Sequence, residues 1–158
     1  MTSKAKLRDV IADDLEIFFE DQRDPEGIRM AAFLSRDKDT FMAHWKKILA
    51  DPAIIKKTIL FEGLVAGNIV CFEESEKPLI GYWIGKTYWG KGVATQALGA
   101  LLGQVEIRPL YAYVAKHNVA SFRVLEKCGF KIYSEENDEL MLQLEDREAG
   151  SQSLNDAA

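Results

Sequence analysis

The chain has 158 residues, of which 47% are hydrophobic, and its formal net charge is −5. This length predicts one cored domain over residues 1–145 rather than two, and the acidic balance excludes nucleic acid as a primary partner, because phosphate binding relies on clustered cations. The sequence shows no charged-then-apolar leader and no apolar stretch of bilayer length, so we expect a cytoplasmic protein with no membrane partner.

The first half of the chain predicts a strand, three helices and a hairpin. The strand is expected over residues 6–11 and the helices over 14–22, 25–32 and 40–50, with Asp39 capping the last helix. Two long strands are expected over 54–61 and 64–73, joined by a turn at Glu62 and Gly63.

The next segment joins a buried strand to an amphipathic helix. Residues 79–84 are apolar at nearly every position, as in a strand covered on both faces. Apolar side chains then recur at helical spacing, at Ala94, Ala97, Leu98, Leu101, Leu102 and Val105. Between them, Gly90 and Gly92 let the backbone approach a ligand closely, and the helix start leaves unpaired N–H groups. The segment therefore predicts a turn that can hold a diphosphate.

Two other interpretations of this turn remain open on its own residues. Glycine-rich connections without a ligand are common. A nucleoside-triphosphate loop is the second, because Gly85, Gly90 and Lys91 match the first part of that motif. Gly92, however, stands where the Ser or Thr that holds Mg²⁺ belongs, and successive βα repeats are missing.

The last part of the chain predicts a strand over residues 110–115, a helix capped by Asn118 and a hairpin of 131–133 with 140–144. Gly129 is suited to the left-handed position that ends the helix. From residue 146 to 158 the sequence has no apolar period, so we expect a disordered tail.

Two ordered motifs resemble those of the GCN5-related N-acetyltransferase (GNAT) family. The run from Trp89 to Ala94 resembles its acyl-CoA pyrophosphate loop, with Trp89 replacing Gln or Arg as in the ribosomal-protein N-terminal acetyltransferase branch. Asn118 and the run from Glu126 to Phe130 match the second motif. The resemblance covers roughly residues 5 to 145 and implies an α+β fold. Its mixed, mostly antiparallel twisted sheet would have about six to seven strands, flanked by helices and splayed at the acyl-CoA site.

The resemblance also implies an activity and a set of cofactor contacts. It implies that acetyl-CoA is a co-substrate and that its acetyl group passes to a primary amine in a ternary complex. The spacing of the two histidines, His44 and His117, predicts no metal site. The expected pantetheine contacts are Trp83, Ile84 and Gly85, and the expected pyrophosphate contacts are Trp89, Gly90, Lys91, Gly92, Val93, Ala94 and Thr95. Asn118 is either a helix cap only or also a pantetheine contact.

The proton-transfer groups are harder to assign. Leu125 occupies the position of the usual tyrosine acid, and the branch resemblance indicates Ser121 as its substitute, in contact with the cofactor. The Ser121 hydroxyl can instead bond its own helix backbone. Tyr113 stands where some members carry a glutamate, and Glu73 and Glu74 are either bases acting through water or solvated side chains. The sequence predicts no definite base.

The amine substrate is expected against the early helical segment, at Phe19, Arg23, Asp24 and Met30. An arginine flanked by carboxylates can bind a substrate with an amine and an acid, but helix-end salt bridges and a core aromatic pair explain the same residues.

Cys71 and Cys128 are expected to be reduced core residues, and His44 and His117 lack metal-ligand spacing.

Three functions follow from these residues. The first is an N-acetyltransferase acting on a small molecule or a peptide N-terminus, as a monomer or homodimer. The second is an acyl-CoA sensor without catalysis, and the third a purely structural domain. At neutral pH a lysine costs roughly 4 to 5 kcal/mol to deprotonate against about 1 for an α-amine, so a site without a clear base favours an α-amine.

Overall fold

In the computed structural model, residues 4–31 and 36–145 are described. Their strands are β1 (Ala5–Asp9), β2 (Ile55–Phe61), β3 (Leu64–Glu74), β4 (Lys77–Ile84), β5 (Leu110–Ala115), β6 (Lys131–Glu136) and β7 (Glu139–Leu144). Their helices are α1 (Asp14–Asp21), α2 (Pro25–Ala31), α3 (Lys38–Ala50), a 3₁₀ turn η1 (Lys86–Tyr88), α4 (Val93–Gln104) and α5 (Val119–Lys127). The predicted tail over 146–158 and the end of the second predicted helix, Ala32, lie outside the described residues.

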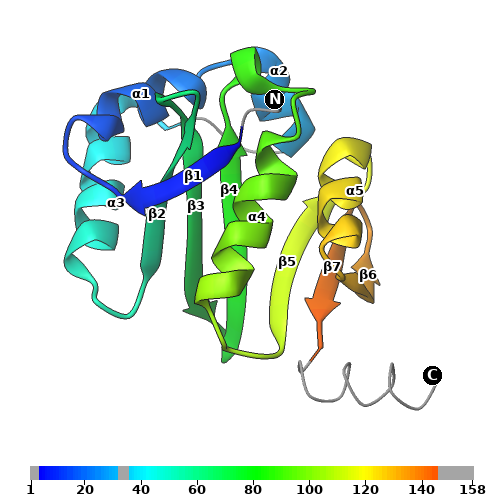
Figure 1. The fold of residues 1–158 in the computed structure, drawn as a ribbon. Helices are drawn as coiled ribbons and strands as arrows, with labels where there is room; N and C mark the ends of the chain where they lie inside the picture. Colours follow the sequence, from blue (N-terminus) through cyan, green and yellow to red (C-terminus); the bar gives the residue numbers. More distant parts are fainter. Residues whose placement is uncertain (1–3, 32–35, 146–158) are drawn as a thin grey trace.

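The described strands form one seven-stranded sheet in the order β1-β2-β3-β4-β5-β7-β6. Every neighbouring pair is antiparallel except β4 and β5, which are parallel. That parallel pair has one register position, Leu79 opposite Tyr111, and Figure 1 shows the two strands separating beyond it. The predicted mixed, splayed sheet is therefore confirmed.

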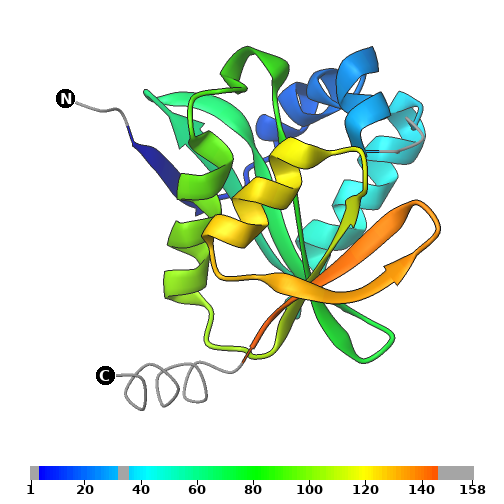
Figure 2. The same cartoon turned by 90° about the vertical axis from the view of Figure 1, so that its right-hand side faces the viewer.

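Helices cover both faces of this sheet (Figure 2). On one face, α4 and α5 contribute Val93, Leu98, Leu101 and Leu125 to the larger core, where they meet sheet residues such as Ile69. On the other face, α1 and α3 pack an aromatic cluster of Phe18, Phe19, Phe41 and Trp45 against β3. Each helix thus buries the apolar stripe that its spacing predicts.

A partly buried ion pair, with a buried carboxylate and a half-buried guanidinium, fixes β1, α1 and β2 to one another. The Asp14 carboxylate accepts hydrogen bonds from Arg8 at 2.7 and 2.9 Å, from the Ile11 amide at 3.0 Å and from the Thr58 hydroxyl at 2.6 Å. Burial acts to raise the pKa of Asp14, but these hydrogen bonds outweigh it and lower the pKa to about 2.

The sequence prediction was wrong about the cap of α3. The cap is Asp37, whose carboxylate accepts from the Thr40 amide at 2.7 Å, and the helix begins at Lys38. Asp39 instead lies in the first helical turn. Other differences are shifts of one to three residues at element ends, the largest at β6, which continues to Glu136.

Candidate functional site

The turn between β4 and α4 is built by two left-handed glycines. Gly90 and Gly92 both have φ of 76°, which a side chain disfavours, and Gly92 is the residue that precedes α4. No side chain caps this helix start, so its first amides are left for an anion. The indole of Trp89 donates to the Ile84 carbonyl at 2.9 Å and closes the turn.

A cavity of about 480 Å³ lies between this turn, α2, β4 and α5. Eleven of the predicted residues line it, namely Met30, Trp83, Ile84, Trp89, Gly90, Gly92, Val93, Ala94, Thr95, Asn118 and Ser121. Gly85 is buried beside it and Lys91 is exposed, and neither lines it. The lining of the cavity is mostly apolar, and it includes the uncapped start of α4. This combination fits a long thioester with a diphosphate.

A pair of hydroxyl groups, one from β4 and one from α5, also lines the cavity. The Asn118 side chain accepts from the Ser121 amide at 3.2 Å and so caps α5. The Ser121 hydroxyl lies 2.6 Å from the Tyr82 hydroxyl on β4, a different partner from the helix carbonyl considered above. Burial raises the pKa of Tyr82 to about 12, although the hydrogen bond with Ser121 acts in the opposite direction.

The model of the acetyltransferase (GNAT) domain matches residues 5–131. The chain belongs to the GNAT family.

Relatives of this GNAT domain agree with that assignment. A Bacillus subtilis (strain 168) protein named "Putative ribosomal N-acetyltransferase YdaF" is 30% identical over 100 residues, which cover 59% of this chain and 55% of that protein. The chain thus matches about half the length of this relative. Its name agrees with the branch that the loop residues indicate.

Solved structures show the same fold. A GNAT acetyltransferase from Bacillus anthracis has a TM-score of 0.73 at 20% identity, covering 92% of this chain and 96% of that one. Spermidine N-acetyltransferase from Vibrio cholerae, in complex with CoA and spermine, has a TM-score of 0.75 at 15% identity, covering 89% and 93%. The predicted GNAT fold is confirmed.

Three of the predicted substrate residues of this GNAT domain lie outside the cavity. Phe19 packs edge-on against Phe41 in the core, with ring centroids 5.4 Å apart. Arg23 is exposed, pairs with Glu20 at 3.3 Å and stacks over Phe19. Asp24 accepts from the Gly27 amide at 2.8 Å at the start of α2. The structure thus brings Met30, but not these three, to the cofactor residues.

The candidate bases are also away from the cavity. Tyr113 is exposed on β5, and Glu73 and Glu74 are exposed at the end of β3. Sequence reasoning missed Asp21, a half-buried carboxyl at the end of α1. Burial, with a smaller contribution from Glu20, raises its pKa to about 7. The one signal for Asp21 in the sequence is that it follows the aromatic residues Phe18 and Phe19 of α1.

One cysteine and one histidine, Cys128 and His117, contact backbone carbonyls. Burial raises the pKa of both thiols, which opposes nucleophilic chemistry, and the Cys128 sulfur contacts the Thr95 carbonyl at 3.8 Å. A ring nitrogen of His117 lies 2.6 Å from the Arg29 carbonyl.

Over residues 4–31 and 36–145 no group of side chains is arranged to hold a metal, and no helix there is long and apolar enough to span a bilayer.

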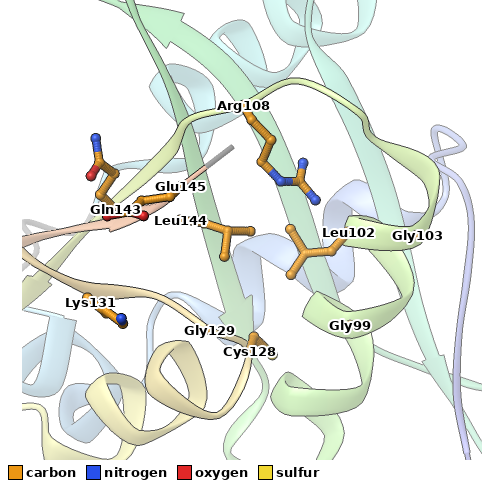
Figure 3. A pocket seen from close by; sticks show the side chains of 10 residues that line it. All are labelled: Gly99, Leu102, Gly103, Arg108, Cys128, Gly129, Lys131, Gln143, Leu144 and Glu145. Atoms are coloured by element: carbon orange, nitrogen blue, oxygen red, sulfur yellow. The ribbon is translucent and has the colours of Figure 1, made fainter. Parts of the chain in front are cut away.

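A second hollow of about 430 Å³ lies between α4, the start of β6 and the end of β7 (Figure 3). Arg108 at its edge donates to the Val105 carbonyl at 3.0 Å and to that of Ile107 at 2.8 Å, which completes the C-terminus of α4. This hollow contains none of the predicted site residues, and Arg108 has a structural role there.

Proposed function

We propose that this GNAT domain transfers the acetyl group of acetyl-CoA to a primary amine, by direct attack of the amine on the thioester while both substrates are bound. The amine belongs to a small molecule or to a peptide or protein N-terminus. The observation that carries the proposal is the cavity that joins the uncapped start of α4 to the Tyr82–Ser121 hydroxyl pair. One end suits a diphosphate, and the other can give a proton to a departing thiolate.

The residues of the cavity take separate roles in this proposal. Amides at Gly92 to Thr95 hold the pyrophosphate, and the end of β4, from Trp83 to Gly85, lies along the pantetheine arm. Ser121 is the catalytic acid. Met30 on α2 is the substrate residue that lines the same cavity. Because no carboxylate lines it among residues 4–31 and 36–145, an α-amine, which loses its proton at lower cost than lysine, is the favoured acceptor.

The relatives support an amine acceptor, since one is named for ribosomal acetylation and another for spermidine. We further propose that the domain covers residues 1–145, acts in the cytoplasm as a monomer or homodimer, and engages neither nucleic acid nor membrane. The formal charge of −5 supports the last point for nucleic acid.

Thermal melting tests the cofactor site. At a hundredfold excess over its dissociation constant, a ligand stabilises the folded state by about 2.7 kcal/mol, so CoA should raise Tm by roughly 5–10 °C. Gly92→Val should abolish this shift. Gly63→Val is the matched control, because Gly63 has the same left-handed backbone, with φ of 79°, in the distant β2–β3 turn. An equal CoA shift in both folded variants contradicts the site.

Measuring the release of free CoA distinguishes a transferase from an acyl-CoA sensor. Acetyl-CoA is incubated with amino acids, polyamines and peptides, and acetylated products are identified by mass spectrometry. The transferase releases CoA in step with one class of product. Tight CoA binding without any product, across all three amine classes, would instead identify a sensor that uses the same cavity.

A further inference from the structure

Tyr82 and Ser121 come from opposite walls of the cavity and meet in it. Tyr82 belongs to β4 and Ser121 to α5, and 39 residues separate them in the sequence. Their hydroxyl oxygens are 2.6 Å apart, at the short end of the range for O–H···O bonds. Both residues line the cavity that the proposed function assigns to acetyl-CoA.

The direction of this hydrogen bond follows from acidity. A phenol is a far stronger acid than an aliphatic alcohol, so the Tyr82 hydroxyl is the better donor and the Ser121 oxygen the better acceptor. The Ser121 amide is already held by Asn118, which fixes the first turn of α5. With its oxygen accepting from Tyr82, Ser121 has its own hydrogen left to donate elsewhere.

We propose that Tyr82 is a positioning residue that supplies a proton through Ser121 to the thiolate leaving from acetyl-CoA. As the amine nitrogen bonds to the acetyl carbon, the carbon–sulfur bond breaks and its electron pair stays on sulfur. The Ser121 O–H proton moves to sulfur, and the Tyr82 O–H proton moves to the Ser121 oxygen. The proton lost by the amine nitrogen returns through solvent to the Tyr82 phenolate, so the net transfer is from nitrogen to sulfur.

Of the two hydroxyl groups, Tyr82 is the better one to end with the negative charge. Serine acting alone would have to become an alkoxide, whereas the relay leaves the charge on a phenolate, which delocalises it. Burial raises the pKa of Tyr82 and so opposes this proton transfer, whereas the hydrogen bond with Ser121 lowers the pKa and favours it. The inference rests on the proposed transferase function and on Ser121 as its acid.

A double-mutant cycle with Tyr82→Phe and Ser121→Ala tests the relay. Tyr82→Phe removes one hydroxyl, and we expect kcat to fall about tenfold to a hundredfold with the KM for acetyl-CoA and the CoA melting shift unchanged. Because both residues serve one proton path, the double variant should be no slower than Ser121→Ala alone. Tyr133→Phe, which removes a phenol from exposed β6, is the control and should keep wild-type kcat.

The outcomes separate the relay from the transferase function. No CoA release by the wild type with any amine overturns the function, and the relay with it. Release by the wild type together with an unchanged kcat in Tyr82→Phe overturns the relay alone. So does a double variant whose loss equals the product of the two single losses, because independent groups multiply their effects.

A second variant covers the case in which Tyr82→Phe melts well below the wild type. Incorporation of 3-fluorotyrosine at position 82 keeps the ring and the hydroxyl but makes the phenol more acidic. The relay predicts a higher kcat at the same KM, since the proton moves more readily. An unchanged kcat overturns the relay.

Discussion

Ser121 is held from two directions, through its amide by Asn118 and through its hydroxyl by Tyr82. If it protonates the leaving thiolate, Ser121→Ala should lower kcat about a hundredfold and leave CoA affinity nearly unchanged. Steady-state kinetics and the CoA melting shift measure the two effects. Ser134→Ala on exposed β6 is the matched control, and equal kcat in the two variants would contradict the assignment.

The Asp14 carboxylate makes the free energy of unfolding decrease at low pH. Its pKa is about 2 in the fold, below the usual 3.8 of an aspartate, so its stabilisation is fully present well above pH 4 and is lost as the pH falls through 2. Asp14→Asn leaves Arg8 without its partner and should cost about 3 kcal/mol at pH 7. Urea unfolding measures this, with exposed Asp13→Asn as control. Equal midpoints for the two variants would show that the ion pair contributes nothing.

The Asp21 carboxyl group changes folding stability with pH in the opposite direction from Asp14. Its pKa is raised from 3.8 to about 7, so the folded state binds the extra proton and stability falls as the pH rises from 4 through 7. Asp21→Asn should remove this dependence and be more stable at pH 8 by about 1 kcal/mol, a figure reduced for solvent screening. Melting curves of both proteins from pH 4 to 8 test the sign, and parallel curves would contradict it.

At the scale of elements, a glycine on β3 allows the end of β4 to lie close to that strand. A Cβ on Gly67 would collide with the Trp83 carbonyl oxygen and come within 3.1 Å of the Ile84 Cα. Gly67→Ala must therefore push β4 away from β3 where the pantetheine arm is proposed to lie. We expect a loss of about 1–3 kcal/mol in stability and a smaller CoA melting shift.

Gly81→Ala is the matched control for Gly67→Ala. Gly81 lies on the same strand pair, but its Cβ would meet only side chains, those of Val70 at 3.8 Å and Phe72 at 3.9 Å, which are ordinary contacts. The control should therefore keep its stability and its CoA shift. Similar losses in both variants would mean that any added methyl group disturbs this pair, and that close backbone approach at Gly67 is not the cause.

Comparison of elements shows which features the sequence predicts. Periodic apolar spacing located α4, and the glycines located its start, because both signals are local. Asp37 and Asp39 are chemically alike, and only the extended backbone at Asp37 decides which one caps α3. The Tyr82–Ser121 contact and the buried Asp21 were missed, because each depends on which distant strand or helix lies opposite. Arg23 was expected to face the substrate on composition alone, whereas its ion pair lies on the surface.

At the scale of the whole molecule, the proposed cavity joins segments from both ends of the chain. Its walls include α2, β4, α4 and α5. CoA should therefore slow amide hydrogen exchange at the end of β4 and in the first turns of α4 and α5 together, since one ligand contacts all three. The turn between β6 and β7 is the internal control. Protection confined to one wall would contradict a shared site.

The single register position between β4 and β5 also has a mechanical consequence. The antiparallel ladders on either side have eight positions between β3 and β4 and six between β5 and β7. A load applied between β1 and β7 acts in series across the five strand junctions that lie between them, so the shortest one, β4 with β5, should part at the lowest force. A coenzyme that contacts both β4 and α5 would bridge that junction and raise the force needed to separate it. The parts of the sheet on either side, β1 to β4 and β5 to β6, would remain intact.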